Sequence, residues 1–162
     1  MKHIEYALLD IKTAITDHLQ TKLTAIQTEM NTLEGFTITL TAPISTAYYI
    51  HELAAIDQMP AIQIIADNTN VDIPGGKWND VEHKIIVVCH VVATEGREDY
   101  CAKRAMRFSR AINEIILDHR TIDGSYMNWY ATSVDYKPMM TNGNDMKQEV
   151  WINTVVKMIE NA

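Results

Sequence analysis

The sequence predicts one α+β domain over residues 1–162, in which two long helices pack on a mostly antiparallel sheet of four or five strands. Three observations lead to this fold class. Two segments show the apolar repeat of about 3.6 residues that marks a helix, several others are short β-branched runs, and the two kinds do not alternate regularly. The content of 47% hydrophobic and 22% charged residues in a chain of 162 suits one compact domain.

The first helix is predicted over residues 4–33, where apolar residues recur at steps of three and four. The stripe comprises Ile4, Leu8, Ile11, Ile15, Leu19, Leu23, Ile26, Met30 and Leu33. Threonines such as Thr13 and Thr21 occupy the outer face, and threonine is a mediocre helix former, so packing of the stripe must stabilise this helix. Gly35 is its expected end.

The next segments read as strands and a loop. Residues 36–41 alternate apolar side chains with threonine, which predicts a half-buried strand. Residues 46–59 fit a strand or a short helix, and the sequence does not decide between them. Residues 61–66 form a short apolar run typical of a central strand. Residues 67–80 (DNTNVDIPGGKWND) are dense in turn formers, so we expect an exposed loop.

A long strand follows over residues 81–94, which would span about 46 Å and cross the whole domain. The second helix is predicted over residues 96–120, with acidic residues at its start and His119 and Arg120 at its end. Residues 126–136 and 149–159 are two further strands. They are expected to form a hairpin, because the connection between them contains the turn dipeptide Asn142-Gly143.

Composition excludes several functional classes. With 14 basic and 21 acidic residues the net charge is −7, which disfavours a general nucleic-acid binder. Two cysteines are too few for a disulfide scaffold and fit a reducing compartment. We expect neither a secretory signal nor a membrane segment, since no apolar run approaches about 20 residues.

Catalytic patterns are missing from the sequence. His83 and His90 are seven apart on one predicted strand and so point to opposite faces. His51-Glu52 has Ala55 where a zinc-protease helix needs its second histidine. Residues 75–78 (GGKW) lack the upstream glycine and the Ser or Thr of a phosphate loop. We therefore expect no catalytic, cofactor or metal site, and no enzyme.

Basic residues cluster on the second predicted helix. Residues 97–110 hold five cations against Glu98 and Asp99, a net charge of +3 in an acidic chain. The candidate interface residues are Lys103, Arg104, Arg107 and Arg110. Lys103, Arg107 and Arg110 fall at helical spacing and predict an exposed ridge. It is either an ordinary solvated face or a surface that docks on the acidic part of a second copy, head to tail.

Two predicted strands are apolar on both faces. In residues 81–94, Ile86 and Val88 point one way while Ile85 and Val87 point the other. If both helices lie on one face of the sheet, the other face must be buried by another chain. If one helix covers each face, the protein is a monomer. The apolar side chains on both faces of these strands favour an oligomer over a monomer.

The order of elements resembles the tail terminator and tail-completion (neck) proteins of tailed bacteriophages. Residues 83–116 carry most of the likeness, as HKIIVVCHVV followed by EDYCAKRAMRFSRAINEII. Val134-Asp135-Tyr136 and Val150-Trp151-Ile152 on either side of the last loop add to it. The likeness is a pattern of elements over nearly the whole chain and contains no diagnostic motif.

This resemblance implies a non-enzymatic virion protein, assembled in the host cytoplasm into a hexameric ring at the end of the tail tube. Its partners would be its own copies, the tail tube protein and the head connector or neck proteins. DNA would only pass through the lumen, in keeping with the acidic charge. The polar loops would contact tube or connector, and their candidate contact residues are Asp67, Asp72, Lys77, Trp78, Met139, Asn142 and Asp145.

Two alternatives stay open at the level of sequence. One is a head-tail adaptor or another neck ring with a similar fold. The other is a small cytoplasmic α+β enzyme or ligand-binding domain with His51, Glu52 and either Tyr48 or Tyr49 in a cleft.

Overall fold

A computed structural model describes residues 4–35, 37–51, 56–72, 78–95, 97–121, 127–143 and 145–161. The elements are α1 (Ile4–Glu34), a 3₁₀ turn η1 (Ser45–Ala47), β1 (Tyr48–Tyr49), β2 (Ala61–Asp72), β3 (Trp78–Ala93), α2 (Glu98–Asp118), β4 (Met127–Tyr136), β5 (Met140–Asn142) and β6 (Asp145–Asn161). The sheet has six strands in the order β1-β2-β3-β6-β4, with β5 also paired to β6. The parallel β1–β2 pair makes the sheet mixed, and the predicted α+β class is confirmed.

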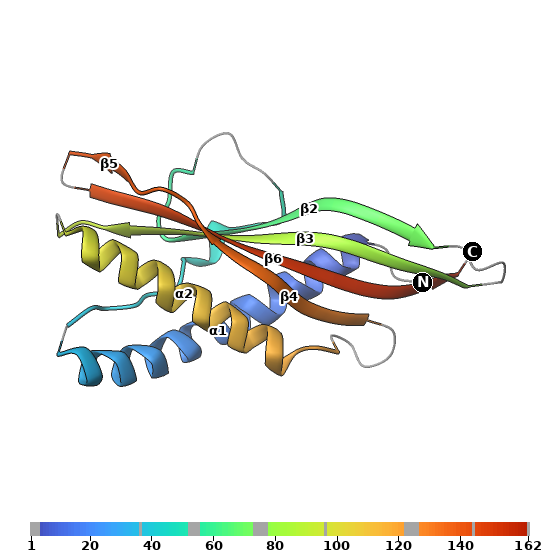
Figure 1. Ribbon diagram of the computed structural model, residues 1–162, viewed down its shortest axis with the longest axis horizontal. Helices are drawn as coiled ribbons and strands as arrows, with labels where there is room; N and C mark the ends of the chain where they lie inside the picture. The colour runs from blue at the N-terminus through green and yellow to red at the C-terminus, as the bar shows by residue number, and fades with distance from the viewer. Residues whose placement is uncertain are drawn as a thin grey trace.

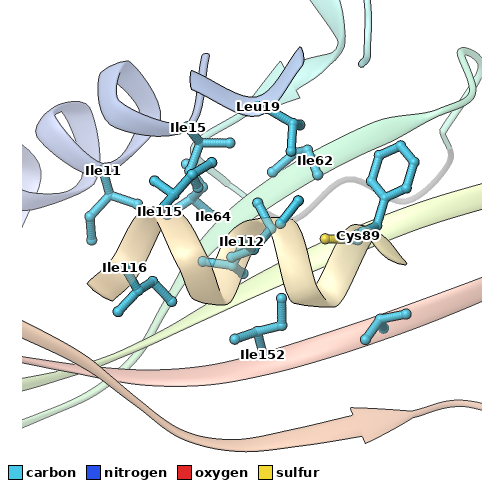
Figure 2. Packing of buried hydrophobic residues seen from close by; sticks show 14 of the residues in the cluster. Ile11, Ile15, Leu19, Ile62, Ile64, Cys89, Ile112, Ile115, Ile116 and Ile152 are labelled. Atoms are coloured by element: carbon cyan, nitrogen blue, oxygen red, sulfur yellow. The ribbon is translucent and has the colours of Figure 1, made fainter. Parts of the chain in front are cut away.

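Both long helices lie on the same face of the sheet (Figure 1). The apolar stripe of α1 and that of α2 are buried between the helices and the strands, as the close view in Figure 2 shows for Ile11, Ile112 and Ile152. Helix α1 ends where predicted, because Gly35 adopts a positive φ of 70° and its N–H bonds to the carbonyl of Asn31. The sequence left open whether the two helices share one face of the sheet or cover one face each, and the structure has both on one face.

Strands β3 and β6 form the central pair of the sheet. Their antiparallel register runs without a break from Trp78 opposite Asn161 to Ala93 opposite Met146. At about 3.4 Å per residue, the 16 residues of β3 span about 54 Å. The predicted domain-crossing strand is confirmed, and it begins three residues earlier than expected.

The exposed loop predicted over residues 67–80 is wrong at residues 67–72 and 78–80, which belong to strands, while residues 73–77 lie outside the described residues. Strand β2 continues to Asp72 and pairs with β3 through Val71 opposite Val81, so the segment is the distal part of a long hairpin. Polar side chains there reflect solvent exposure at the sheet edge, which a strand tolerates. A register shift between Ala66 and Asn68, a β-bulge, marks the change from the apolar to the polar half of β2.

The strand predicted over residues 36–41 is also wrong, although its alternation of burial is right. Ile38 and Leu40 are buried, yet the segment pairs with no strand among the described residues. Side-chain amides of α1 take the place of a neighbouring strand. Asn31 bonds both N–H and C=O of Ile38, Gln27 accepts from the N–H of Leu40 at 2.7 Å, and Gln20 bonds the Leu40 carbonyl and the Ala42 N–H. This set of contacts is called the amide latch below.

The hairpin of the last two predicted strands is confirmed, as β4 pairs antiparallel with β6. The connection between them holds a further strand, β5, which pairs with the start of β6 through Asn142 opposite Asp145. Gly143 lies in this turn with a φ of 65°, as the Asn-Gly dipeptide predicts. In the open stretch of residues 46–59, the described part holds η1 and the short β1.

Candidate functional site

The basic cluster of α2 faces α1 of the same chain. Lys103 pairs with Glu34, and Arg104 pairs with Glu95 at 2.6 Å. Arg107 is only 4% exposed; its Nη1 donates to Asn31 Oδ1 at 2.8 Å and its Nη2 lies 3.5 Å from the Glu34 carboxylate. The predicted exposed ridge is therefore wrong at Arg107, whereas the Arg110 side chain is 40% exposed. The physical reason is that α1 and α2 share one face of the sheet, which brings the acidic end of α1 against these cations. Contact of Lys103, Arg104, Arg107 and Arg110 with a second copy stays a prediction.

The ion pairs of this cluster shift the pKa values of its members. The hydrogen bond from Lys103 lowers the pKa of Glu34, and the hydrogen bond from Arg104 lowers the pKa of Glu95 to about 2. Burial lowers the pKa of Arg107, against the opposing effect of Glu34. Arg110, which is bonded to Glu29 at 2.8 Å and to Glu114 at 2.9 Å, has a raised pKa. Lys103, Arg107 and Arg110 thus link α2 to the acidic end of α1, whereas Arg104 pairs with Glu95 ahead of α2.

The face of the sheet away from the helices is called the open face. The register places on it the rows Gln63–Val88–Trp151, Ile65–Ile86–Asn153 and Lys84–Val155–Tyr130. Neither α1 nor α2 packs on it (Figure 1). Ile65, Ile86 and Trp151 are half-buried there, whereas Val88 and Val155 are buried at 1% and 5% exposure. The open face is thus partly apolar and flanked by charged side chains.

A groove of about 460 Å³ lies at one end of the open face. Its floor is made by β2, β3 and β6, and its sides by residues of the 56–60 segment and of the chain entering β5. The apolar lining is Ile56, Met59, Ile65, Val88, Pro138, Met140 and Trp151, and the polar lining is Gln63, His90, Lys137, Lys147, Gln148 and Glu149. The groove therefore combines apolar walls with a small set of polar groups, as binding sites do.

A buried polar pair occupies the floor of the groove. His90 Nε2 lies 2.7 Å from Gln63 Oε1, to which it donates, and His90 Nδ1 is 3.7 Å from Glu149. Burial lowers the pKa of His90, although Glu149 opposes the shift. Gln63 is 5% exposed, and its Nε2 has no hydrogen-bond partner among the described residues. An unpaired buried donor is costly, so a ligand acceptor that reached this amide from the groove would be stabilised.

Two lysines add positive charge to the groove. The Lys137 Nζ lies 4.4 Å from the centre of the Trp151 ring, a cation–π contact that holds both side chains at the groove wall. Lys147 stands opposite Met140 in the β5–β6 register. The groove is consequently cationic on one side, in a chain whose net charge is −7.

Sequence reasoning missed this groove, although a signal for it was present. Gln63 interrupts the apolar run of residues 61–66, and His90 interrupts that of residues 85–92. A polar residue inside a β-branched run of a central strand indicates either a buried polar pair or a site. The register of β2 and β3, which the sequence could not supply, sets Gln63 beside Val88 and near His90.

Most of the predicted partner-contact residues lie toward two opposite ends of the sheet. Asp72 ends β2 and Trp78 begins β3 at the hairpin end, whereas Asp67 lies in the middle of β2, at the β-bulge. Met139 directly precedes β5, and Asn142 and Asp145 belong to β5 and β6 at the other end. Lys77 lies outside the described residues. These positions do not come together as one site, and their contact with partner proteins stays a prediction.

Three residues of the enzyme alternative are described, namely Tyr48, Tyr49 and His51. Burial raises the pKa of Tyr48 to about 12, and the ring of Tyr49 lies edge-on to His51 at 6.3 Å. Glu52 lies outside the described residues. Within the described ranges no three His, Cys, Asp or Glu side chains are grouped to hold a metal ion. No helix within those same ranges is long and apolar enough to cross a membrane.

Comparisons with known proteins add a structural likeness to the fold. No family model matches the sequence, and no curated protein matches it either. A chain from the virion of a native gene transfer agent particle is similar in structure with a TM-score of 0.45 and 10% identity, over 70% of this chain and 79% of that one. A similarity at this level supports no conclusion about function, so the proposal below rests on the resemblance in sequence pattern and on the geometry.

Proposed function

We propose that this chain is a non-enzymatic structural protein of a virion, and specifically a tail terminator that assembles as a ring on the tail tube and joins it to the head connector. The observation that carries the proposal is the one-sided placement of α1 and α2, which leaves the half-buried Ile65, Ile86 and Trp151 of the open face uncovered by either long helix. Apolar surface of this kind is buried when copies of a chain associate.

The residues of the resemblance support the same proposal. Residues 83–116 form most of β3 and α2, which are central to the sheet and to the helix layer. The remaining likeness, around Asp135 and Trp151, falls on neighbouring positions of β4 and β6. The pattern that resembles tail terminators is therefore one folded unit of strand, helix and closing hairpin.

The shape of the molecule is compatible with a ring. The hairpin end and the β5 end lie far apart along the long axis (Figure 1). A contact between unlike ends of identical copies is heterologous, and it closes into a ring when the rotation between copies permits. Subunit number and the identity of the neighbouring virion proteins belong to the proposal.

Light scattering after size-exclusion chromatography tests this function, first on the protein alone and then after mixing with purified tail tubes. We expect a defined oligomer, or a shift of the monomer onto the ends of tubes. Electron microscopy of tubes with the labelled protein should place the label at one terminus. A label along the tube wall or in the neck would contradict the terminator assignment. A monomer that binds neither itself nor tubes would contradict the function altogether.

A further inference from the structure

We infer that the groove on the open face of one copy binds the exposed edge of β2, residues 66–72, from a second copy of this chain. The inference rests on the proposed function and deepens it, because it names the two unlike surfaces through which a ring would close.

The chemistry of the groove specifies its ligand. Gln63 Nε2 needs a hydrogen-bond acceptor, since it is buried and unpartnered among the described residues. Met59 and Trp151 offer an apolar wall for one side chain, while Lys137 and Lys147 favour a carboxylate. The ligand is therefore an acidic, extended segment with a free carbonyl and one apolar side chain.

The edge of β2 has these properties. Strand β1 pairs with β2 only at Ile62 and Gln63, so the outer edge of residues 64–72 faces no strand among the described residues. Its backbone carbonyls on that side have no strand partner within the described ranges and can accept hydrogen bonds from another chain. Residues 66–71 are all exposed, and Val71 is 54% exposed. The segment 66–72 contains two aspartates, Asp67 and Asp72, and no cation.

Other exposed apolar side chains fit the groove less well. Tyr6 and Leu9 are about half exposed on α1, close to Glu5 and Asp10 in the sequence. The carbonyls of a helix interior are already bonded within the helix, so this surface could offer Gln63 no backbone acceptor. An edge strand supplies charge, an apolar side chain and free carbonyls together, which is why the observations favour β2.

The two surfaces also have suitable positions. The groove surrounds the row of His90 and Glu149, whereas the β2 edge ends at the row of Val71 and Val81, toward the other end of β3. A copy that inserts its edge into the groove of its neighbour leaves its own groove free for the next copy. The contact therefore propagates head to tail.

Charge reversal on each surface tests the contact. The groove variant is K137E/K147E, the edge variant is D67K/D72K, and the combined variant carries all four changes. We expect each two-residue variant to raise the dissociation constant of self-association about tenfold, and the combined variant to recover most of the loss, since opposite charges again face each other. Sedimentation velocity at low and high salt measures this, with K12E/R120E, away from both surfaces, as the charge-matched control for the groove variant and circular dichroism to confirm folding.

Cross-linking tests the same contact without altering charge. Val71→Cys combined with Met140→Cys places one thiol on each surface, and both positions are well exposed. Mild oxidation should produce a ladder of covalent oligomers, whereas Val71→Cys with Leu117→Cys on α2 should not. The native thiols Cys89 and Cys101 are buried and should not contribute.

The outcomes separate this inference from the proposed function. If the wild type forms a ring but the charge variants assemble equally well and no ladder forms, the groove–edge contact is wrong while the function stands. If the wild type neither associates with itself nor binds tail tubes, both are overturned. The contact would be established if self-association weakens in both two-residue variants and recovers in the combined variant, and if the paired cysteines give a ladder of covalent oligomers.

Discussion

The two faces of the sheet differ in how their side chains are covered. On the helix face, Ile85, Val87 and Cys89 are fully buried beneath α1 and α2. On the open face, Ile86 is half-buried and the row of Gln63 and Val88 borders a groove. Adjacent residues of one strand thus belong to different environments. The helix face therefore supplies most of the folding stability, and the half-buried side chains of the open face leave surface on which another molecule can bind.

The largest effect on stability is expected at Ile85, in contrast with its neighbour Ile86 on β3. Ile85→Ala should lower the free energy of unfolding by about 3 kcal/mol, since it leaves a cavity in a packed core. Ile86→Ala should cost only about 1 kcal/mol, because its side chain is half-buried. Urea unfolding of the two variants measures both values. Equal losses of unfolding free energy in the two variants would show that the open face is as tightly packed as the helix face, contrary to the difference described above.

The second effect concerns the ion pairs between the helices. Arg107→Ala removes a buried guanidinium that bonds Asn31 and neighbours Glu34, and should cost about 2 kcal/mol. The matched variant Arg110→Ala removes a cation that is 40% exposed and should cost about 0.5 kcal/mol. Thermal unfolding of both proteins would decide, and a larger loss at Arg110 would contradict the buried role of Arg107.

A smaller effect is expected at the amide latch. Gln27→Ala leaves the N–H of Leu40 without its acceptor and should cost about 1 kcal/mol. Thr21→Ala, an exposed change on the same helix, should be neutral or slightly stabilising, since alanine is the better helix former. Amide hydrogen exchange at Leu40 should accelerate in the first variant and stay unchanged in the second.

The smallest effect is a pH dependence on the open face. Burial lowers the pKa of His90 in the folded protein, so the unfolded chain binds its proton more readily. Stability from this residue is complete above the unfolded value of about 6.5, and it is lost as the pH falls through the lowered folded value. His90→Gln should flatten the unfolding free energy between pH 7 and about pH 5. An unchanged slope would show that His90 titrates alike in both states.

Much of this fold could be predicted from periodicity. The stripes of α1 and α2, the long β3 and the β4–β6 hairpin all follow from local patterns, because each element buries a face that its own sequence marks. Residues 36–41 and 67–80 could not be assigned correctly, because a local pattern shows which side chains are buried but not which groups the backbone bonds. Burial alternates in the first and polarity dominates the second, but the hydrogen-bond partners lie elsewhere in the chain, on Gln20, Gln27 and Asn31 or on β3.

The candidate site was harder to predict than the fold. The spacing of Lys103, Arg107 and Arg110 shows that they share a helical face, but it does not show that the acidic end of α1 meets that face. The groove depends on register between β2, β3 and β6 and on the segment that carries Met59. Such contacts join residues far apart in the chain, and local pattern carries no information about them.

The unbroken pairing of β3 with β6 fixes the length of the sheet. Because the two strands match residue for residue over their whole length, the distance between the two ends of the sheet is set by the number of paired residues. Adding two residues to each strand between those ends would lengthen it by about 7 Å while keeping every side chain on its own face. If copies associate through both ends, as proposed above, the assembly would then change its diameter, and the length of this ribbon would set how wide a closed circle of copies can be.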